Sequence, residues 1–273
     1  MMSLPSSRKR RLFYRFSLFA CYTLALTPCR SWVLPSIGRK KSHARTTLVA
    51  TIDDYDDTDA KSQFGSKGYW DDTYQGRGDF PMDEYQWYFG FEEYGKFVES
   101  YVPSKEAEIL IPGIGNDPIL LDLLHKGYRR LTATDYSEFA IDRQQDLLSH
   151  QKYPFATDLD AKHDESAKIV GDENQEPTVL LQMDAREMPS QWAQKFGAII
   201  EKGALDAIYL SGDGYIELAA KEFERILKPG GILISVSGVV PEDLRKEIFK
   251  DWTWIRDGRE DLSAGCFILE KPK

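Results

Sequence analysis

Cysteine is scarce in this chain of 273 residues. Of the three cysteines, Cys21 and Cys29 lie within the first 50 residues, so that only Cys266 remains in the rest of the chain and no intramolecular disulfide is expected there. The four histidines are scattered, and none forms a cluster with cysteines at the spacing of a zinc site. We therefore predict no bound metal.

Acidic side chains are absent from residues 1–50, which carry ten Lys or Arg. Basic RKRR precedes an apolar run of eleven residues, Phe16–Leu26, which is too short to span a bilayer but fits the hydrophobic region of a signal peptide. The next stretch, WVLPSIGRKKSHARTTLVAT, is basic and hydroxylated like an organelle transit peptide. Residues 1–50 thus resemble the two-part plastid presequence of algae with secondary plastids. A mitochondrial presequence is the alternative. We expect no stable membrane association once the presequence has been removed.

A basic excess is missing from the remainder of the chain. All 44 acidic side chains follow residue 50, together with 25 of the 35 basic ones, which gives a formal net charge of −19. This negative charge disfavours nucleic acid as a partner and is compatible with a basic protein partner.

The polar segments divide the chain. Residues 51–67 are acidic and nearly free of aliphatic side chains, so we expect a flexible linker there. A second polar stretch, 150–178, has no sustained period and is predicted to be a long surface loop. The folded domain is expected to cover residues 68–273.

Short apolar runs alternate with helical patterns over this domain. Buried strands are predicted at 108–112, 131–135, 179–183, 197–201, 231–237 and 266–270, and helices near Asp117, Ser137, Asp213 and Pro241. KPGG at 228–231 ends the helix before the fifth strand. Residues 252–271, WTWIRDGREDLSAGCFILEK, supply a closing pair of strands. The pattern indicates an α/β fold: a doubly wound, Rossmann-like, seven-stranded, mostly parallel sheet with helices on both faces and an antiparallel last strand.

A third glycine is missing from the loop after the first strand. Dinucleotide folds use G-x-G-x-x-G to receive a pyrophosphate, whereas Gly113 and Gly115 are followed here by Asp117 and Pro118. An acid at that helix entrance repels phosphate and favours a ligand with positive charge, such as S-adenosylmethionine.

Two further acids end the next strands. Asp135 is placed to accept hydrogen bonds from ribose hydroxyls, and Asp184 with the amide of Ala185 to contact an adenine edge. Either acid, taken singly, is equally well explained as a helix cap or a solvated strand end.

The sequence resembles the class I, seven-stranded S-adenosylmethionine-dependent methyltransferases. Within them it resembles the methyltransferase-like lysine methyltransferases that act on elongation factor 1A and on citrate synthase. The resemblance covers about Gly68 to Lys273 and rests on six segments: YWDDTY (69–74), YQWYFGFEEY (85–94), IPGIGND (111–117), TDYSEFAI (134–141), MDAREM (183–188) and EKGALDAI (201–208). Pro112, Asp117, Ala204 and the 150–178 insert depart from the family pattern.

The resemblance implies a binding site for S-adenosylmethionine and its product S-adenosylhomocysteine. The implied contacts are Gly113, Gly115 and Asn116 to the methionine portion, Asp135 and Tyr136 to the ribose, Asp184 and Ala185 to the adenine, and Glu201 at the mouth of the transfer site. Trp70 and Trp87 fall in the segment that closes over the cofactor in this family, where a ring face attracts a sulfonium. Core and lid packing explains these rings equally simply.

A protein lysine is the expected methyl acceptor, and a small molecule is the alternative. Glu201 and Asp206 are the candidates to orient the amine or take its proton, although Asp206 is also explained by the dipole of the helix that it begins. The Asn/Asp-Pro-Pro-aromatic run of enzymes that methylate adenine or glutamine is absent, since EKGA stands in its place. A third possibility is a scaffold that binds the cofactor without transferring methyl groups.

Overall fold

The computed structural model describes residues 60–78, 87–158, 176–212, 214–259 and 264–273. The expected presequence (1–50), the first part of the expected linker and the middle of the 150–178 insert lie outside the described residues. Within the described ranges, every helix is too short or too polar to span a membrane.

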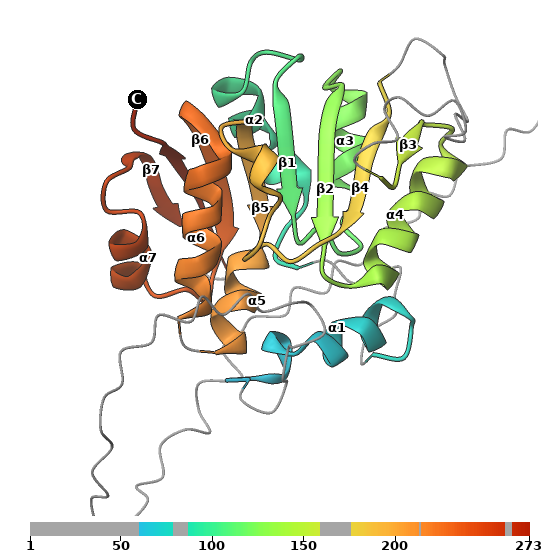
Figure 1. Cartoon of the computed structure of the whole chain (residues 1–273), viewed down its shortest axis with the longest axis horizontal. Coiled ribbons are helices and arrows are strands. Elements are labelled where there is room, and N and C mark those ends of the chain that lie inside the picture. Colours follow the sequence, from blue (N-terminus) through green and yellow to red (C-terminus); the bar gives the residue numbers. More distant parts are fainter. Residues whose placement is uncertain (1–59, 79–86, 159–175, 213, 260–263) are drawn as a thin grey trace, which may run out of the picture. The chain divides into compact units, whose positions relative to one another are not determined.

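The described residues form one sheet with the strand order β3-β4-β2-β1-β5-β6-β8-β7. The strands are β1 (Glu108–Pro112), β2 (Arg130–Asp135), β3 (Phe155–Ala156), β4 (Thr178–Gln182), β5 (Phe196–Lys202), β6 (Leu227–Ser237), β7 (Thr253–Arg259) and β8 (Gly265–Glu270). All pairs are parallel except those of β8, which runs antiparallel to β6 and β7. The predicted doubly wound, mostly parallel fold with an antiparallel last strand is confirmed (Figure 1).

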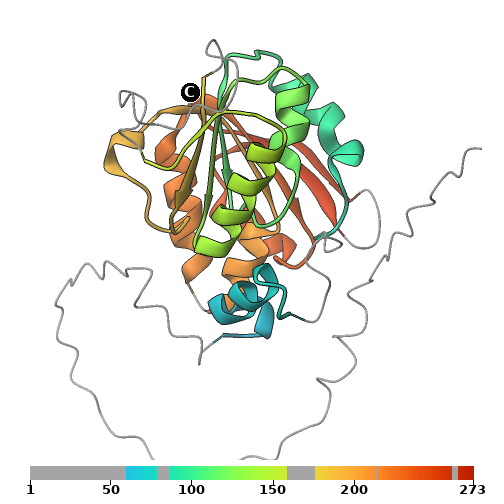
Figure 2. The ribbon, with the colours of Figure 1, turned by 90° about the vertical axis from the view of Figure 1, so that its right-hand side faces the viewer.

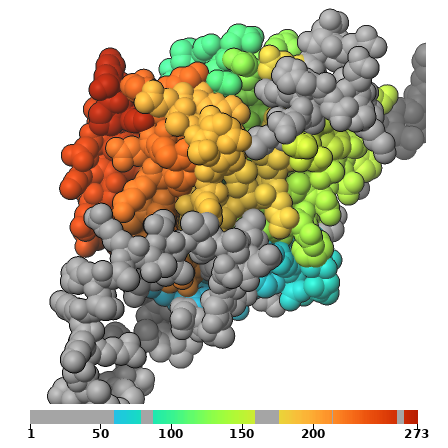
Figure 3. All heavy atoms as spheres, viewed as in Figure 1, coloured from blue at the N-terminus to red at the C-terminus, as the bar shows by residue number. Residues whose placement is uncertain are grey.

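The described helices are α1 (Lys67–Tyr74), α2 (Phe91–Tyr101), α3 (Ile119–His125), α4 (Glu138–His150), α5 (Ala204–Ser211), α6 (Tyr215–Ile226) and α7 (Glu242–Ile248). Helices α2, α3 and α4 pack on one face of the sheet, and α6 and α7 pack on the other. Alternate residues of β1 enter different cores. Ile109 and Ile111 pack with α2, α3 and α4, whereas Leu110 packs with α5 and α6. In the space-filling view, gold and orange atoms of the part of the chain from β4 to α6 lie in the middle of the face shown (Figure 3).

The structure differs from the sequence-based expectations in three places. The insert 150–178 contributes the two-residue strand β3, so the sheet has one strand more than the predicted seven, and Thr178 already belongs to β4. Residues Gln63–Gly65, expected in the linker, form a 3-10 helix (η4) that packs on α5. Helix α6 does end ahead of KPGG, but β6 starts at once at Leu227 and includes it, with a register shift opposite Phe196.

The chain reverses direction across the sheet beside β1. It runs from β1 to β2 and β4 on one side, and then crosses to β5 and β6 on the other. Ligands of such folds bind outside the carboxyl ends of the strands at this switch point. Helices α1 and α5 lie just beyond these strand ends, as two perpendicular views show (Figures 1 and 2).

Candidate functional site

A cleft that is partly open to solvent lies at the switch point, and the space within it, open solvent included, is about 860 Å³. Concave sites of this kind, at the switch points of α/β sheets, are where small molecules usually bind. The cavity is lined by Gly65, Trp70, Tyr74, Trp87, Gly113, Ile114, Gly115, Asn116, Asp117, Asp135, Tyr136, Met183, Asp184, Ala185, Arg186, Lys202, Gly203, Ala204, Ala207, Ile208 and Ser211. The strand ends of β1, β2, β4 and β5 therefore meet in one site.

The glycine loop after β1 needs both of its glycines. Gly113 and Gly115 have φ angles of +63° and +53°, in the left-handed region that favours glycine. A Cβ on Gly113 would lie 2.7 Å from the Cβ of Ala204, and one on Gly115 would lie 2.6 Å from the Tyr74 hydroxyl. The loop therefore brings bare backbone to the floor of the cavity.

Asp135 is fixed by that loop. Its carboxylate accepts hydrogen bonds from the backbone N–H groups of Gly115 and Ser137, both at 2.9 Å. The side chain is almost fully buried, and burial raises the pKa of Asp135 to about 6, although these two hydrogen bonds oppose the rise. The carboxylate thus faces the cavity with little solvation.

Asp184 is held by a neighbour that the sequence analysis missed. The Arg186 guanidinium donates to both carboxylate oxygens, from Nε at 2.8 and 2.9 Å and from Nη2, and the Arg186 N–H donates to Oδ1 at 2.8 Å. Arg186 lines the cavity too, and its guanidinium lies 4.9 Å from the centre of the Tyr215 ring. An adenine amine would therefore meet a carboxylate already engaged by arginine.

Asp117 is also paired, which changes the argument made from its charge. Its carboxylate forms an ion pair with the Lys202 ammonium, and both side chains are nearly buried. The negative charge at the helix entrance is therefore neutralised, so repulsion of phosphate by a lone acid is not a property of this site. The Asp117 carboxylate also accepts from the N–H of Ile119, the first residue of α3, at 2.9 Å, and Pro118 is the N-cap residue of that helix.

Glu201 and Asp206, the expected proton acceptors, lie behind the cavity wall. Both are completely buried, and neither is among the lining residues. The Glu201 carboxylate accepts from the Ser235 hydroxyl and from the Leu205 N–H at 3.2 Å. Burial raises the pKa of Glu201 to about 7. This geometry argues against direct contact between either carboxylate and a methyl acceptor in the cavity. A role of Glu201 or Asp206 as proton acceptor stays a prediction.

Aromatic rings from two segments roof the cavity. Trp70 stacks on Tyr74 of the same helix with ring centres 5.8 Å apart, and it meets Trp87 edge-on at 5.4 Å. The Trp87 ring also meets Phe64, which lies in η4, edge-on at 5.4 Å. Residues 64–74 and Trp87 thus close one side of the site.

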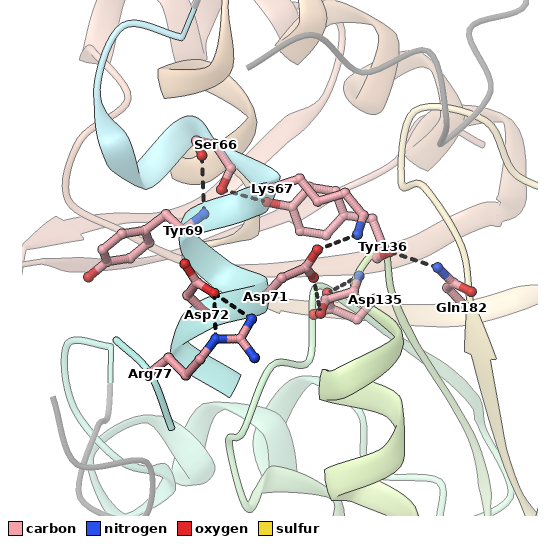
Figure 4. A network of polar contacts seen from close by, with 10 residues as sticks. Ser66, Lys67, Tyr69, Asp71, Asp72, Arg77, Asp135, Tyr136 and Gln182 are labelled. Carbon is pink, nitrogen blue, oxygen red and sulfur yellow. Dashed lines mark hydrogen bonds and ion pairs between the residues drawn. The ribbon is translucent and has the colours of Figure 1, made fainter. Parts of the chain in front are cut away.

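A polar network ties α1 to the end of β2 (Figure 4). Lys67 and Asp71 form an ion pair at 2.6 Å, and the Ser137 hydroxyl donates to Asp71 at 2.5 Å. The Tyr136 hydroxyl donates to the Ser66 carbonyl at 3.4 Å. Since Tyr136 and Asp135 are adjacent, the same strand end holds the roof and lines the cavity.

Nine of the residues expected at the cofactor site do line the cavity: Trp70, Trp87, Gly113, Gly115, Asn116, Asp135, Tyr136, Asp184 and Ala185. Lining residues that the sequence analysis missed include Gly65, Tyr74, Arg186 and Lys202. Tyr74 and Lys202 stand in segments already singled out, whereas no local signal marks Gly65. Among the described residues, no group of His, Cys, Asp or Glu is arranged to hold a metal ion.

The fold has a match among solved structures. No protein-family model matches the chain. A solved structure from work on the conversion of a disulfide bond into a thioacetal group during echinomycin biosynthesis superposes with a TM-score of 0.53. It is 15% identical and covers 76% of this chain and 93% of its own. At that identity the likeness shows the shared fold alone.

The comparison with curated proteins finds relatives that are named as lysine methyltransferases. The chain is 27% identical over 205 residues to EEF1A lysine methyltransferase 2 of Danio rerio, a match over 70% of this chain and 76% of the relative. It is 24% identical over 181 residues to the eEF1A lysine and N-terminal methyltransferase homolog of Drosophila melanogaster, over 65% of this chain. The match spans only 23% of that longer protein. The resemblance to lysine methyltransferases of elongation factor 1A is confirmed.

Proposed function

We propose that this protein is an S-adenosylmethionine-dependent methyltransferase whose acceptor is a protein lysine. The observation that carries the proposal is the meeting of the glycine loop, Asp135 and the aromatic roof in one cavity at the switch point. The likeness to relatives named as lysine methyltransferases supports it.

The lining of the cavity fits this cofactor on two grounds. The backbone of Gly113 and Gly115 lines the cavity beside Asn116, where the methionine portion is expected. Asp135 presents a carboxylate to the ribose, with Tyr136 beside it, whereas Asp184 and Ala185 border the remaining space for adenine.

Positioning is the chain's main contribution to the reaction. When bound, the cofactor supplies an electrophilic methyl group on a sulfonium. The aromatic roof shields one side of the site from water, and a well-oriented acceptor gains a large effective molarity. Because Glu201 and Asp206 lie outside the lining, we propose that neither touches the acceptor amine.

A small-molecule acceptor is the second candidate, and the roof of α1 and Trp87 favours it. A closed pocket suits a small substrate, whereas a protein lysine needs an opening through which its side chain can reach the methyl group. Ile208 and Ser211 on α5 border the same cavity. The net negative charge of the chain after residue 50 would favour a basic protein as the acceptor.

The test begins with calorimetric titration of S-adenosylmethionine and S-adenosylhomocysteine into the protein and into Asp135→Ala. We expect micromolar binding that the substitution abolishes. Radiolabelled methyl transfer is then followed separately in the protein fraction and the small-molecule filtrate of one extract. Label recovered as methyllysine supports the first candidate, and label confined to the filtrate supports the second. Absence of cofactor binding by the folded protein contradicts both.

The site of action is proposed to be an organelle, with a plastid favoured over a mitochondrion. The basic, acid-free residues 1–50 support this. A fluorescent fusion to the whole chain is expected to enter the organelle, and a fusion that lacks residues 1–50 is expected to remain in the cytosol.

A further inference from the structure

We propose that Lys202, Gly203 and Asp206 are positioning residues: together they clamp the backbone at 87–89 and hold the Trp87 ring as a wall of the cavity. The effect of this clamp on ligand binding rests on the proposed function, but the clamp itself does not. It assigns a role to the EKGALDAI segment, where Asp206 was expected to act on a proton.

The Lys202 ammonium is fully engaged by the protein. Its Nζ donates to the carbonyls of Trp87 at 2.9 Å and Phe89 at 3.1 Å, and it pairs with the Asp117 carboxylate. A lysine ammonium has three donors, so these three partners use all of them. With a side chain only 7% exposed, Lys202 is a cross-link between β5, the glycine loop and segment 87–89.

Gly203 makes room for the Trp87 ring. Its φ angle is +77°, and a Cβ at this position would lie 2.2 Å from Cδ1 and 2.4 Å from Nε1 of Trp87. These distances are far shorter than any real contact, so the indole lies directly on the glycine backbone. Any larger residue at 203 would push the ring out of its place in the wall.

Asp206 fixes the middle of the segment. Its carboxylate accepts from the Tyr88 hydroxyl and from the Gly238 N–H at 2.9 Å. The N–H groups of Val239 and Val240 donate to its other oxygen at 3.1 and 2.9 Å. Burial, followed by the negative charge of Asp206, raises the pKa of Tyr88 far above its ordinary value, so the phenol stays a donor. Asp206 therefore binds Tyr88 to the loop after β6.

The backbone of Tyr88 shows why a clamp is needed. Its φ angle is +62°, in the left-handed region, where a residue with a Cβ is strained. Such a conformation persists only when surrounding contacts determine it. Lys202 holds the residues on either side of Tyr88, and Asp206 holds its side chain. Together they keep the neighbouring Trp87 ring against Trp70.

The decisive experiment compares Lys202→Met with Lys126→Met, which removes an exposed lysine that pairs with Glu99. Quenching of tryptophan fluorescence by acrylamide is measured for each protein and for its counterpart carrying Trp87→Phe, so that the difference isolates Trp87. Binding of S-adenosylhomocysteine is measured by calorimetry. Tyr88→Phe, which deletes only the hydroxyl, is the second variant in case Lys202→Met does not fold.

We expect Lys202→Met to raise the quenching of Trp87 severalfold and to weaken S-adenosylhomocysteine binding by about tenfold, or about 1.4 kcal/mol. Tyr88→Phe is expected to act in the same direction with a smaller effect, and Lys126→Met to change neither quantity. Unchanged Trp87 quenching in folded Lys202→Met and Tyr88→Phe would overturn the clamp. If the parent protein binds no S-adenosylhomocysteine, the proposed function fails, and the quenching measurement still decides the clamp.

Discussion

The Ser137 hydroxyl donates a hydrogen bond to the Asp71 carboxylate at 2.5 Å, although 66 residues separate them. Asp71 belongs to α1, and the Ser137 N–H is bonded to Asp135. The roof of the cavity is therefore attached to the same turn that positions the carboxylate expected to bind ribose.

Removal of this attachment is expected to loosen α1. A net hydrogen bond contributes about 0.5–1.5 kcal/mol, so Asp71→Ala, which deletes the acceptor, should weaken S-adenosylhomocysteine binding by about two- to tenfold. Hydrogen exchange should become faster in Lys67–Tyr74 with little change elsewhere. Asp72→Ala is the control, since Asp72 pairs with Arg77 at the exposed surface. Equal effects of the two substitutions would contradict a specific attachment through Asp71.

The raised pKa of Asp135 predicts a pH-dependent affinity. Only the ionised carboxylate accepts hydrogen bonds from two ribose hydroxyls, and the pKa in the free protein is about 6. Affinity for S-adenosylhomocysteine should therefore rise with pH through about 6 and level off above it, and below that pH its slope should approach about tenfold per pH unit. Calorimetry across this range checks the profile. Asp135→Asn should bind weakly with a flat profile, and a flat profile in the parent protein would contradict the assignment.

Glu201 predicts a pH-dependent stability. Its pKa is raised to about 7 from an ordinary value of 4.5, so the folded protein holds a proton that the unfolded chain has lost. This contribution to stability is complete below pH 4.5 and is lost as the pH rises through about 7. Relative to the parent, Glu201→Gln should gain up to about 1.4 kcal/mol in unfolding free energy per pH unit across that window.

Denaturant unfolding at several pH values measures this difference. Glu247→Gln, at an exposed position of α7, is the control and should follow the parent at every pH. A difference between Glu201→Gln and the parent that is constant with pH would show that the Glu201 side chain does not hold the extra proton.

Gly113 predicts a steric conflict that a second substitution relieves. Gly113→Ala places a methyl group 2.7 Å from the Ala204 Cβ and occupies the left-handed region, for an expected loss of about 2–4 kcal/mol. Ala204→Gly in the same protein should restore part of that loss. Gly127→Ala, where φ is +86° and no atom lies within 4 Å, isolates the backbone cost. Thermal unfolding of the parent, Gly113→Ala, Ala204→Gly and the double variant gives the coupling free energy between the two positions. Strict additivity would exclude the contact between residues 113 and 204 as the cause.

The sequence was informative where the signal is local. Apolar runs that end in a glycine loop or an acid predict parallel strands and place Gly113, Asp135 and Asp184 at one edge of a sheet, where the structure has them. Strand β3 was missed because two residues make no periodic pattern. The η4 helix was missed because the polar stretch around it has the composition of a linker.

The roles of the acidic side chains depend on partners that lie far away in the sequence. The sequence alone determined the fold and the edge of the sheet where the cofactor is expected, because strands, caps and positive-φ glycines depend on neighbours along the chain. Only the tertiary structure showed that Asp117 is neutralised by Lys202 and that Asp206 holds Tyr88, a residue 118 positions away. The charge and accessibility of a carboxylate depend on whichever side chains the fold brings to it, and no local pattern encodes them.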